Sequence, residues 1–584
     1  MMIGEYQYIA RHVCCGPFRY RPRSYDLKRR LERNPETWEV LGVGVSILII
    51  GAGVAGLSTG CYAQMNGFTT EIFEMGDKPG GLCTAWTRGG YTFDYCIHNL
   101  AGTAPSSRYY RMWRELGALQ PESNTRAGAE STAEEAELAR PYSPEARTRP
   151  AGPDWTDAGG CPVYHYKELV RVEDPSGKSL TIGPDIDRLE RDLVALAKDD
   201  TGVIREYVQG VRAFKGLDLL SLTGAGIGGA LRLLPHAGKV LRWMKPTLAE
   251  FAQRFSDPFL RRAFRYVQYD MPATPTGVHL SMIAGMSRGD CGWPVGGSLA
   301  FSRAIERRYR DLGGRVHYRS KVARILTENG RAVGVRLADG SEHRGDVVVS
   351  AADGHGTIFD MLEGRYVNQA VRSYYAAAPE TQDMALHVCF GVNRDLSREP
   401  HALVLLLDKP VEIAGHVRDR LGVEILNFDP VMAPPGKSVI KVPLEARYAF
   451  WQSLKSGGGD AYRAAKEEVA AQVLDLLETR FSGLGRQVEV TDVSTPLTVE
   501  RYTGNWRGLQ AWMPPGNPMG AFLKGAFMST LPGLGGFFMV GQWACGVIGL
   551  TTAASAGRRL VQSLCRRFGR PFAAFESESE EYRR

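Results

Sequence analysis

The feature that most constrains the fold is a glycine-rich hexapeptide, GAGVAG, at residues 51–56. A short apolar run at 45–50 precedes it and is typical of a buried parallel strand. A helical stretch follows at 57–66, and Gly67 is a helix-ending glycine. Residues 69–74 predict a second strand. Together they form a βαβ unit with G-x-G-x-x-G where dinucleotide-binding proteins carry it.

An acidic residue completes this fingerprint, because Glu74 ends the second predicted strand. Gly51 allows a tight turn, Gly53 lets a diphosphate approach the backbone, and Gly56 lets helix and strand pack closely. The helix N-terminus then faces the diphosphate with N–H groups, and Glu74 hydrogen-bonds a ribose hydroxyl. The alternative is a glycine turn that serves packing alone, and the acid and the flanking strands argue against it.

The composition excludes several classes of protein. The chain has 584 residues, of which 44% are hydrophobic and 23% charged, as in ordinary globular proteins. The net charge of +7 is modest and not gathered into one tract, so we expect no nucleic-acid partner. Ten cysteines without C-x-x-C spacing indicate reduced thiols, with neither a disulfide framework nor a metal site. We expect a cytoplasmic chain without a secretory signal or a transmembrane helix.

The same alternation of strands and helices returns later in the chain. The pattern predicts a helix at 299–312, a strand at 316–318, a hairpin of 322–327 and 332–337 around Asn329-Gly330, a strand at 346–350, and a strand, glycine turn and helix within 536–564. Three segments lack such patterns. We expect residues 1–44 to form an N-terminal extension, 120–160 a flexible insertion and 571–584 a disordered tail.

Several segments together resemble a known superfamily. They are Lys78-Pro79-Gly80-Gly81, Gly90-Tyr91-Thr92-Phe93-Asp94, Trp293-Pro294-Val295-Gly296-Gly297 and Gly541-Gln542-Trp543. The set is similar to the flavoprotein superfamily of amine oxidases and carotenoid desaturases. Within it, the chain resembles FAD-dependent phytoene desaturases, carotenoid isomerases and retinol saturases. The resemblance implies an α/β fold with a Rossmann-type, glutathione-reductase-like FAD-binding domain, assembled from discontinuous segments and interleaved with an α+β substrate domain.

The resemblance also suggests how the chain is divided. We expect the FAD-binding domain to comprise residues 45–119, 290–360 and 491–570. We expect the substrate domain, including a membrane-facing part, to comprise residues 161–289 and 361–490.

The resemblance implies FAD as the cofactor and marks the residues that hold it. The expected set is Gly51, Gly53, Val54, Ala55, Gly56, Glu74, Met75, Lys78, Gly80, Gly81, Leu82, Val322, Gly541, Gln542, Gly549 and Leu550. Gln542 departs from the acidic residue that is usual in the family, but a neutral amide also hydrogen-bonds a ribityl chain. Cys545 lies in the expected flavin neighbourhood, where we favour a small buried residue over covalent attachment to flavin.

Few side chains are needed for catalysis, because the cofactor performs the difficult step. Asp94 and His98 are the candidates for acid–base work. Four residues apart, they would share a face on a helical turn, although the segment also suits a loop. The alternative for Asp94 is a structural role as a helix cap, which we favour. Histidine is the side chain type suited to proton transfer near neutral pH, which makes His98 the second candidate.

Residues 216–245 interleave leucines and glycines with basic residues. This pattern suits an amphipathic segment that lies on a membrane, and Pro235 would interrupt a single helix there. The alternative is an ordinary core helix at a domain boundary. If the segment binds a membrane, basic residues near the C-terminus would assist it, namely Arg558, Arg559, Arg566 and Arg567.

These features indicate an FAD-dependent oxidoreductase that acts on a hydrophobic polyene or isoprenoid, carotenoid-like or retinoid-like, by hydride transfer at C–C bonds. Such a substrate implies a peripheral membrane protein. One alternative is a flavin amine oxidase-type enzyme with a small substrate. Another is a non-redox module of the same fold that binds prenylated proteins, and the intact nucleotide fingerprint argues against it. The pattern leaves desaturation, saturation and isomerisation open, as it does the oligomeric state.

Overall fold

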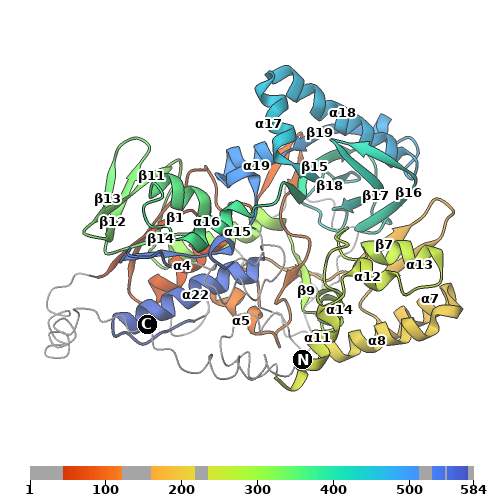
Figure 1. Ribbon diagram of the computed structural model, residues 1–584, viewed down its shortest axis with the longest axis horizontal. Coiled ribbons are helices and arrows are strands. Elements are labelled where there is room, and N and C mark those ends of the chain that lie inside the picture. The colour runs from red at the N-terminus through yellow and green to blue at the C-terminus, as the bar shows by residue number, and fades with distance from the viewer. Residues whose placement is uncertain (1–43, 122–159, 217–233, 512–528, 546–548, 576–584) are drawn as a thin grey trace, which may run out of the picture. The chain divides into compact units, whose positions relative to one another are not determined.

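A computed structural model describes residues 44–121, 160–216, 234–511, 529–545 and 549–575 (Figure 1). Nearly all of the predicted N-terminal extension and of the predicted insertion at 120–160 lies outside these residues. The elements described here belong to one unit that begins at Ser46. Across the described ranges, no helix is long and apolar enough to cross a membrane.

A five-stranded sheet in the order β10-β2-β1-β14-β20 carries the glycine motif (Figure 1). Its strands are β1 (Ser46–Ile50), β2 (Thr69–Phe73), β10 (Arg315–His317), β14 (Val347–Ser350) and β20 (Phe537–Met539). All neighbouring pairs are parallel, and the apolar strand β1 lies at the centre, as its composition predicts. The strands come from distant parts of the chain, so the prediction of a Rossmann-type domain assembled from discontinuous segments is confirmed.

Helices α4 (Val54–Met65) and α15 (Gly297–Asp311) pack against this sheet, and α22 (Leu550–Arg567) packs on α4. The contact between α4 and α22 is close because α22 presents Gly557, where a Cβ would lie 2.7 Å from the Thr59 nitrogen. Ser58 Oγ also donates to the Ala554 carbonyl at 2.8 Å. The C-terminal helix is therefore fixed against the helix that follows the glycine loop.

The predicted hairpin forms a separate antiparallel sheet of β11 (Val322–Glu328), β12 (Arg331–Leu337) and β13 (Glu342–Arg344). At its turn, Asn329 and Gly330 have φ of +49° and +71°. Positive φ at both positions is what a two-residue type I′ turn requires, and Asn-Gly is the preferred pair for it. The Asn-Gly prediction is confirmed.

A seven-stranded mixed sheet lies in the order β19-β15-β18-β17-β16-β7-β8. Its strands are β7 (Val170–Glu173), β8 (Ser179–Ile182), β15 (Thr381–Val392), β16 (Ala402–Ile413), β17 (His416–Ile425), β18 (Ser438–Arg447) and β19 (Val488–Ser494). Helix α18 (Gly459–Glu478) packs on it, and α17 (Tyr448–Ser456) follows β18, with Trp451 fully buried in the core between them. The predicted boundary at residue 490 is wrong, because β19 continues the edge of this sheet to Ser494.

The remaining elements are short. The strands are β3 (Ala85–Arg88), β4 (Tyr91–Asp94), β5 (Leu100–Ala101), β6 (Val163–Tyr164) and β9 (Cys291–Pro294). The helices are α5 (Arg108–Glu115), α7 (Ile186–Leu196), α8 (Thr201–Lys215), α11 (Ala237–Met244), α12 (Leu248–Ala252), α13 (Pro258–Ala263), α14 (Thr276–Met286), α16 (Gln369–Ala376), α19 (Pro496–Thr503) and α21 (Gln542–Cys545). Short turns of other helix types are η3 (Lys198–Asp200), η4 (Leu234–His236), η5 (Phe264–Tyr266), η6 (Gly356–Met361), η7 (Gly485–Gln487) and η8 (Trp506–Gly508).

Two predictions about irregular segments can be compared with the structure only in part. In the predicted membrane segment, residues 217–233 lie outside the described ones, and α11 buries Trp243 while Leu241 is 67% exposed. The predicted disordered tail is wrong for residues 571–575. There the Ala573 N–H donates to Asn66 Oδ1 at 2.7 Å and the Phe575 carbonyl accepts from Arg308 at 3.1 Å, so this part docks on the helices.

Candidate functional site

The glycine loop turns the chain from β1 into α4. Gly51 has φ of +96°, a left-handed conformation that favours glycine. A Cβ on Gly56 would lie only 2.0 Å from the Gly51 carbonyl oxygen, so no larger residue fits there. Gly53 is the N-cap of α4, and no side chain among the described residues caps the first turn, in which Val54 and Ala55 are buried. The N–H groups and the positive end of the helix dipole are left for an anion.

Glu74 lies beside this loop, directly after β2. Its Oε2 accepts the Ala52 N–H at 2.7 Å, and its Oε1 accepts the Gly76 N–H at 2.7 Å. Burial raises the pKa of Glu74, and the backbone hydrogen bonds act in the opposite direction. A carboxylate oxygen that accepts one hydrogen bond retains a lone pair, which a ribose hydroxyl can use.

The second glycine pair adjoins the first loop. The Gly80 N–H donates to the Ala52 carbonyl at 2.9 Å, and a Cβ on Gly53 would lie 3.8 Å from the Gly80 oxygen. Gly80 and Gly81 both have positive φ. Of the other residues predicted here, Lys78 donates from Nζ to the Ala85 carbonyl at 2.6 Å, while Met75 and Leu82 are half-buried. The Lys78 ammonium therefore binds backbone.

The C-terminal glycine segment approaches the same helix end. Gly541 follows β20 with φ of +93°, and a Cβ there would lie 3.1 Å from the Ala55 Cβ. Gln542 opens α21, and its Oε1 accepts the N–H of Gly549 at 3.0 Å. Gly549 is the N-cap of α22, and Leu550 is that helix's first residue. The amide of Gln542 thus joins the start of the short helix α21 to the N-cap of the long helix α22.

Val322 lies apart from these contacts. Its side chain is buried in the apolar core with Leu48 and Ile50 of β1. This leaves its backbone for contact with a nucleotide. The cofactor role of the whole predicted set stays a prediction, but its members gather mainly around the first turn of α4.

Asp94 ends β4, and it does not lie on a helical turn with His98. Its fully buried carboxylate accepts the Ser298 N–H at 2.6 Å and the Ser298 hydroxyl at 2.7 Å. It also accepts the backbone N–H groups of Cys96 and Ile97. Burial raises its pKa, and the nearby Lys441 charge lowers it. The geometry therefore gives Asp94 the alternative role, a carboxylate at the start of α15.

His98 lies in the loop after β4 and contacts Glu424, which in turn contacts Lys441, and the sequence singled out neither of these two residues. Its Nδ1 lies 2.5 Å from Glu424 Oε1, and Glu424 Oε2 lies 2.8 Å from Lys441 Nζ. Burial would raise the Glu424 pKa, but the charges of His98 and Lys441 outweigh burial and hold it well below its usual range. Burial also acts to lower the Lys441 pKa, and Glu424 and Asp94 raise it above its usual value.

A small cavity of about 10 Å³ adjoins the triad of His98, Glu424 and Lys441, and the first two of these residues line it. Aromatic rings line it, including Tyr166, which stacks on His401 with ring centroids 4.0 Å apart. Burial lowers the pKa of His401 to about 4, so this neighbouring imidazole is neutral at physiological pH. The space accommodates about one water molecule. An imidazole, an ionised carboxylate and a buried ammonium thus share one aromatic environment.

Tyr95 links the triad's surroundings to the C-terminal glycine segment. Its ring stacks on His387 with centroids 4.5 Å apart, and its hydroxyl faces the Gln510 side chain. The Gln510 carbonyl accepts from Gln542 Nε2 at 3.3 Å. The loop after β4, the seven-stranded sheet and the segment after β20 are therefore joined by successive contacts.

Comparison with known protein families shows which family has this arrangement. A profile of the flavin containing amine oxidoreductases matches residues 244–564, more than half of the chain, and a profile of NAD(P)-binding Rossmann-like domains matches residues 49–116. The chain belongs to the flavin-containing amine oxidoreductase family. Membership in this family makes the chain a flavin-dependent oxidoreductase and confirms the flavoprotein superfamily that the sequence motifs predicted.

Among individual members of the amine oxidoreductase family, the chain is similar to two carotenoid enzymes. A prolycopene isomerase of Daucus carota is 23% identical over 516 residues, which cover 84% of this chain and 76% of the relative. A lycopene-forming phytoene desaturase of Pseudescherichia vulneris is 25% identical over 524 residues, which cover 84% of this chain and 95% of the relative. The predicted resemblance to carotenoid desaturases and isomerases is confirmed.

A solved structure of redesigned putrescine oxidase matches 90% of this chain and 99% of its own, with a TM-score of 0.51 and 12% sequence identity. This likeness establishes a shared fold. The site residues fit the flavin of the family, because the uncapped helix end, the Cβ-free approach at Gly53 and the Glu74 carboxylate match a diphosphate and a ribose.

Proposed function

We propose that the chain is an FAD-dependent oxidoreductase that desaturates or saturates carbon–carbon bonds in a hydrophobic polyene or isoprenoid, of the carotenoid or retinoid kind. The observation that carries the proposal is the meeting of distant segments, residues 51–56, Glu74, 80–81 and Gly541, at the first turn of α4. The two relatives, a prolycopene isomerase and a phytoene desaturase, support a polyene as the substrate class.

The adenine dinucleotide form of the flavin is supported by the chemistry of the first loop. The N-terminal end of α4 suits a diphosphate, and Glu74 suits the ribose of the adenosine half. A flavin mononucleotide lacks both the diphosphate and the adenosine half, so it would need neither the N-terminal end of α4 nor Glu74. We therefore propose FAD as the cofactor.

The bound flavin would take up a hydride from an allylic C–H bond in desaturation, or return one to a double bond in saturation. Either direction also moves a proton at the neighbouring carbon. We propose that His98 handles this proton. Because its Nδ1 contacts Glu424, the Nε2 nitrogen is the one left to exchange a proton. Lys441 keeps Glu424 ionised, and Glu424 in turn stabilises the protonated imidazole.

The proposal is tested by the visible absorption spectrum of the purified protein under anaerobic conditions. We expect a flavin spectrum that bleaches when phytoene in liposomes is added. Putrescine, added in the same way, should leave it unchanged. Bleaching by putrescine alone would instead support a small amine as the substrate, and a colourless protein that cannot be loaded with FAD would contradict the cofactor assignment.

A matched pair of variants tests the ribose contact. Glu74→Gln removes the charge of the carboxylate, and we expect the bound FAD per protein to fall at least tenfold. Asp77→Asn, three residues further on and exposed, removes the same charge without touching the glycine loop. Equal FAD content in the two variants would contradict the role of Glu74.

A further inference from the structure

Two cysteines lie opposite each other beside the second glycine pair. The antiparallel pairing of β3 with β4 continues past the strand ends, because the Tyr95 N–H donates to the Thr84 carbonyl at 3.1 Å. The next pair in this register is Cys83 and Cys96. Opposite residues that flank a hydrogen-bonded pair have Cα atoms about 4.5 Å apart, and a disulfide needs a Cα separation of about 4.4–6.8 Å. The register therefore places these two cysteines at the spacing of a disulfide.

The contacts of the two side chains agree with this register. Burial raises the pKa of Cys83 well above its usual value, and the adjacent Cys96 thiol raises it further. The Cys83 thiol also donates to the Ser298 carbonyl at 3.5 Å. The Cys96 N–H donates to the carboxylate of Asp94, to which the Ser298 N–H donates as well. Both cysteines therefore contact the same cluster at the start of α15.

The two thiols differ in exposure, and this difference sets the order in which they can react. Cys83 is only 2% exposed. Among the cysteines that the structure describes, Cys96 alone is not buried, so a small reagent reaches it first. A buried thiol with a raised pKa is a poor nucleophile toward a reagent in solution, but it can attack a sulfur that is already held beside it. Cys96 is therefore suited to the first attack and Cys83 to the second.

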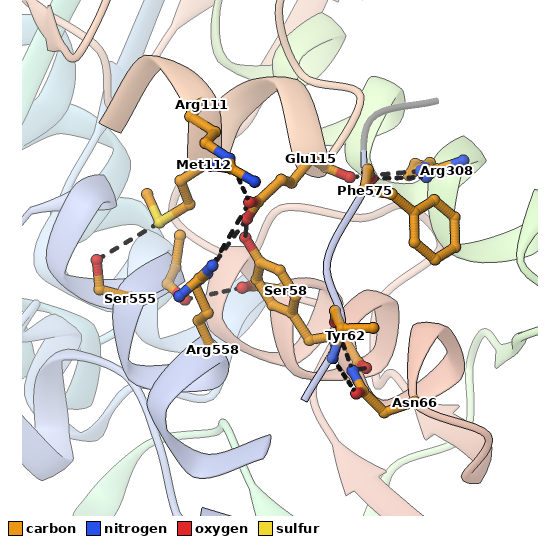
Figure 2. A network of polar contacts seen from close by, with 12 residues as sticks. Ser58, Tyr62, Asn66, Arg111, Met112, Glu115, Arg308, Ser555, Arg558 and Phe575 are labelled. Carbon is orange, nitrogen blue, oxygen red and sulfur yellow. Dashed lines mark hydrogen bonds and ion pairs between the residues drawn. The ribbon is translucent and has the colours of Figure 1, made fainter. Parts of the chain in front are cut away.

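Cys61 provides a contrast within the same part of the fold. It is fully buried, its thiol donates to the Ile305 carbonyl at 3.7 Å, and burial raises its pKa to about 12. The adjoining Tyr62 donates to Glu115 of α5, which also contacts Arg558 of α22, so these two helices cover α4 at this level (Figure 2). Cys61 is therefore a thiol that we expect to stay unmodified.

We propose that Cys83 and Cys96 are a redox-active pair that forms a reversible disulfide on reaction with a low-molecular-weight disulfide. The Cys96 thiolate attacks one sulfur of the reagent, so that a mixed disulfide forms and one reagent thiolate leaves. The Cys83 thiolate then attacks the Cys96 sulfur, which forms the intramolecular disulfide and releases the second reagent thiolate. The two cysteines lose two electrons and two protons, and the reagent takes up both and leaves as two thiols.

The disulfide joins two segments of the proposed site. The Cys83 N–H donates to the Gly80 carbonyl at 2.9 Å, so Cys83 belongs to the turn that contains the second glycine pair. On the other side, Cys96 lies two residues before His98 in the loop after β4. Oxidation therefore fixes the glycine turn to the loop that carries His98. The inference goes beyond the proposed reaction, and its readout is the state of the sulfur atoms.

Treatment of the native full-length protein with glutathione disulfide tests the proposal. The remaining thiols are titrated in denaturant, and Cys83→Ser/Cys96→Ser provides the baseline. We expect the wild-type protein to lose two more thiols than this double variant and to regain them on reduction. Peptide mapping should find Cys83 joined to Cys96, because trypsin cleaves between them after Arg88, and should find Cys61 unmodified.

The single variants test the order of the two attacks. Cys83→Ser should retain glutathione on Cys96, because the second thiol is missing. Cys96→Ser should leave Cys83 unmodified, because Cys83 is buried. Cys161→Ser removes another buried thiol and is the matched control, which should form the same disulfide as the wild type. Thermal unfolding confirms that each variant is folded.

Three results would overturn the proposal. One is equal thiol loss in the wild-type protein and the double variant, which would mean that neither cysteine is oxidised. Another is a disulfide that joins Cys83 or Cys96 to a different cysteine. The third is equal glutathione content in the two single variants, which would contradict the distinct roles of the exposed and the buried thiol.

Discussion

Gly541 lies against Ala55, so that a Cβ on Gly541 would come within 3.1 Å of the Ala55 Cβ. The contact joins the segment after the last strand of the parallel sheet to the helix that follows its first strand. A flavin bound at the proposed site would therefore lie near residues from distant parts of the sequence. Position 541 therefore leaves little room for a larger side chain, and the backbone of Gly541 has φ of +93°.

The first prediction concerns this contact. Gly541→Ala should destabilise the protein by about 1–3 kcal/mol through its backbone conformation and also lower flavin content, because the Cβ crowds Ala55. Gly533→Ala is the matched control, since Gly533 also has positive φ but open space around it. Thermal unfolding and flavin-to-protein ratio are the measurements. Similar flavin content in both variants would show that the close approach is irrelevant to the cofactor.

The second prediction concerns the buried ammonium of Lys441. Lys441→Met should destabilise the protein by about 3–5 kcal/mol, because Glu424 then keeps a buried charge with one partner fewer. The double variant Glu424→Gln/Lys441→Met removes both charges and should recover much of that loss. Denaturant unfolding of both variants and of Glu424→Gln completes the cycle. Additive effects of the two substitutions would exclude the coupling.

The third prediction concerns pH. Burial raises the pKa of Asp353 from 3.8 to about 7, and hydrogen bonds from backbone N–H groups act in the opposite direction. The folded state thus binds this proton more tightly than the unfolded state. The contribution of Asp353 to the free energy of unfolding is therefore fully present below about pH 3.8 and is lost as the pH rises through about 7. In the Asp353→Asn variant, the unfolding temperature should therefore fall less than in the wild type as the pH rises from about 3.8 to about 7.

Asp408→Asn is the control for that experiment, because Asp408 is an exposed carboxylate on β16 and is not among the groups that shift the pKa of Asp353. Other buried carboxyls also respond to pH, so the difference between variant and wild type is the informative quantity. Parallel curves for the Asp353 variant and the wild type would remove Asp353 as a source of pH dependence.

The fourth prediction concerns His98. His98→Gln should lower turnover of a polyene by about 10²–10⁴-fold while flavin content stays normal, because only the proton-transferring group is lost. The pH dependence of turnover near neutrality should vanish with it. The control is His416→Gln, on the strand β17 that also carries Glu424. This variant should keep both the wild-type turnover and the wild-type pH profile. A slow variant with the wild-type pH profile would point to a purely structural role.

The dinucleotide half of the site was predictable because its determinants are local. The tight turn at Gly51, the close packing at Gly56 and the acid after β2 occur within one βαβ unit, where spacing in sequence nearly fixes spacing in the fold. The Asn329-Gly330 hairpin was predictable for the same reason. Its backbone preference is a property of two adjacent residues.

The triad was not predictable because it depends on pairing between strands. Glu424 and Lys441 are opposite one another on β17 and β18, and His98 reaches them from a loop far earlier in the chain. The one available signal was a lysine inside the apolar run of β18, Ile440-Lys441-Val442. The sequence suggested that Asp94 serves a helix start, but its partner Ser298 could not be identified without the fold.

The position of β20 at the edge of the parallel sheet governs when this protein can acquire its cofactor. The glycine loop and Glu74 leave the ribosome early, but β20 and α22 are synthesised only after the whole seven-stranded sheet. A nascent chain that has completed β14 still lacks the strand and helix that close the flavin site. If the flavin binds at the proposed site, we expect its insertion to follow the synthesis of β20, and we expect a chain truncated before Phe537 to expose the edge of β14.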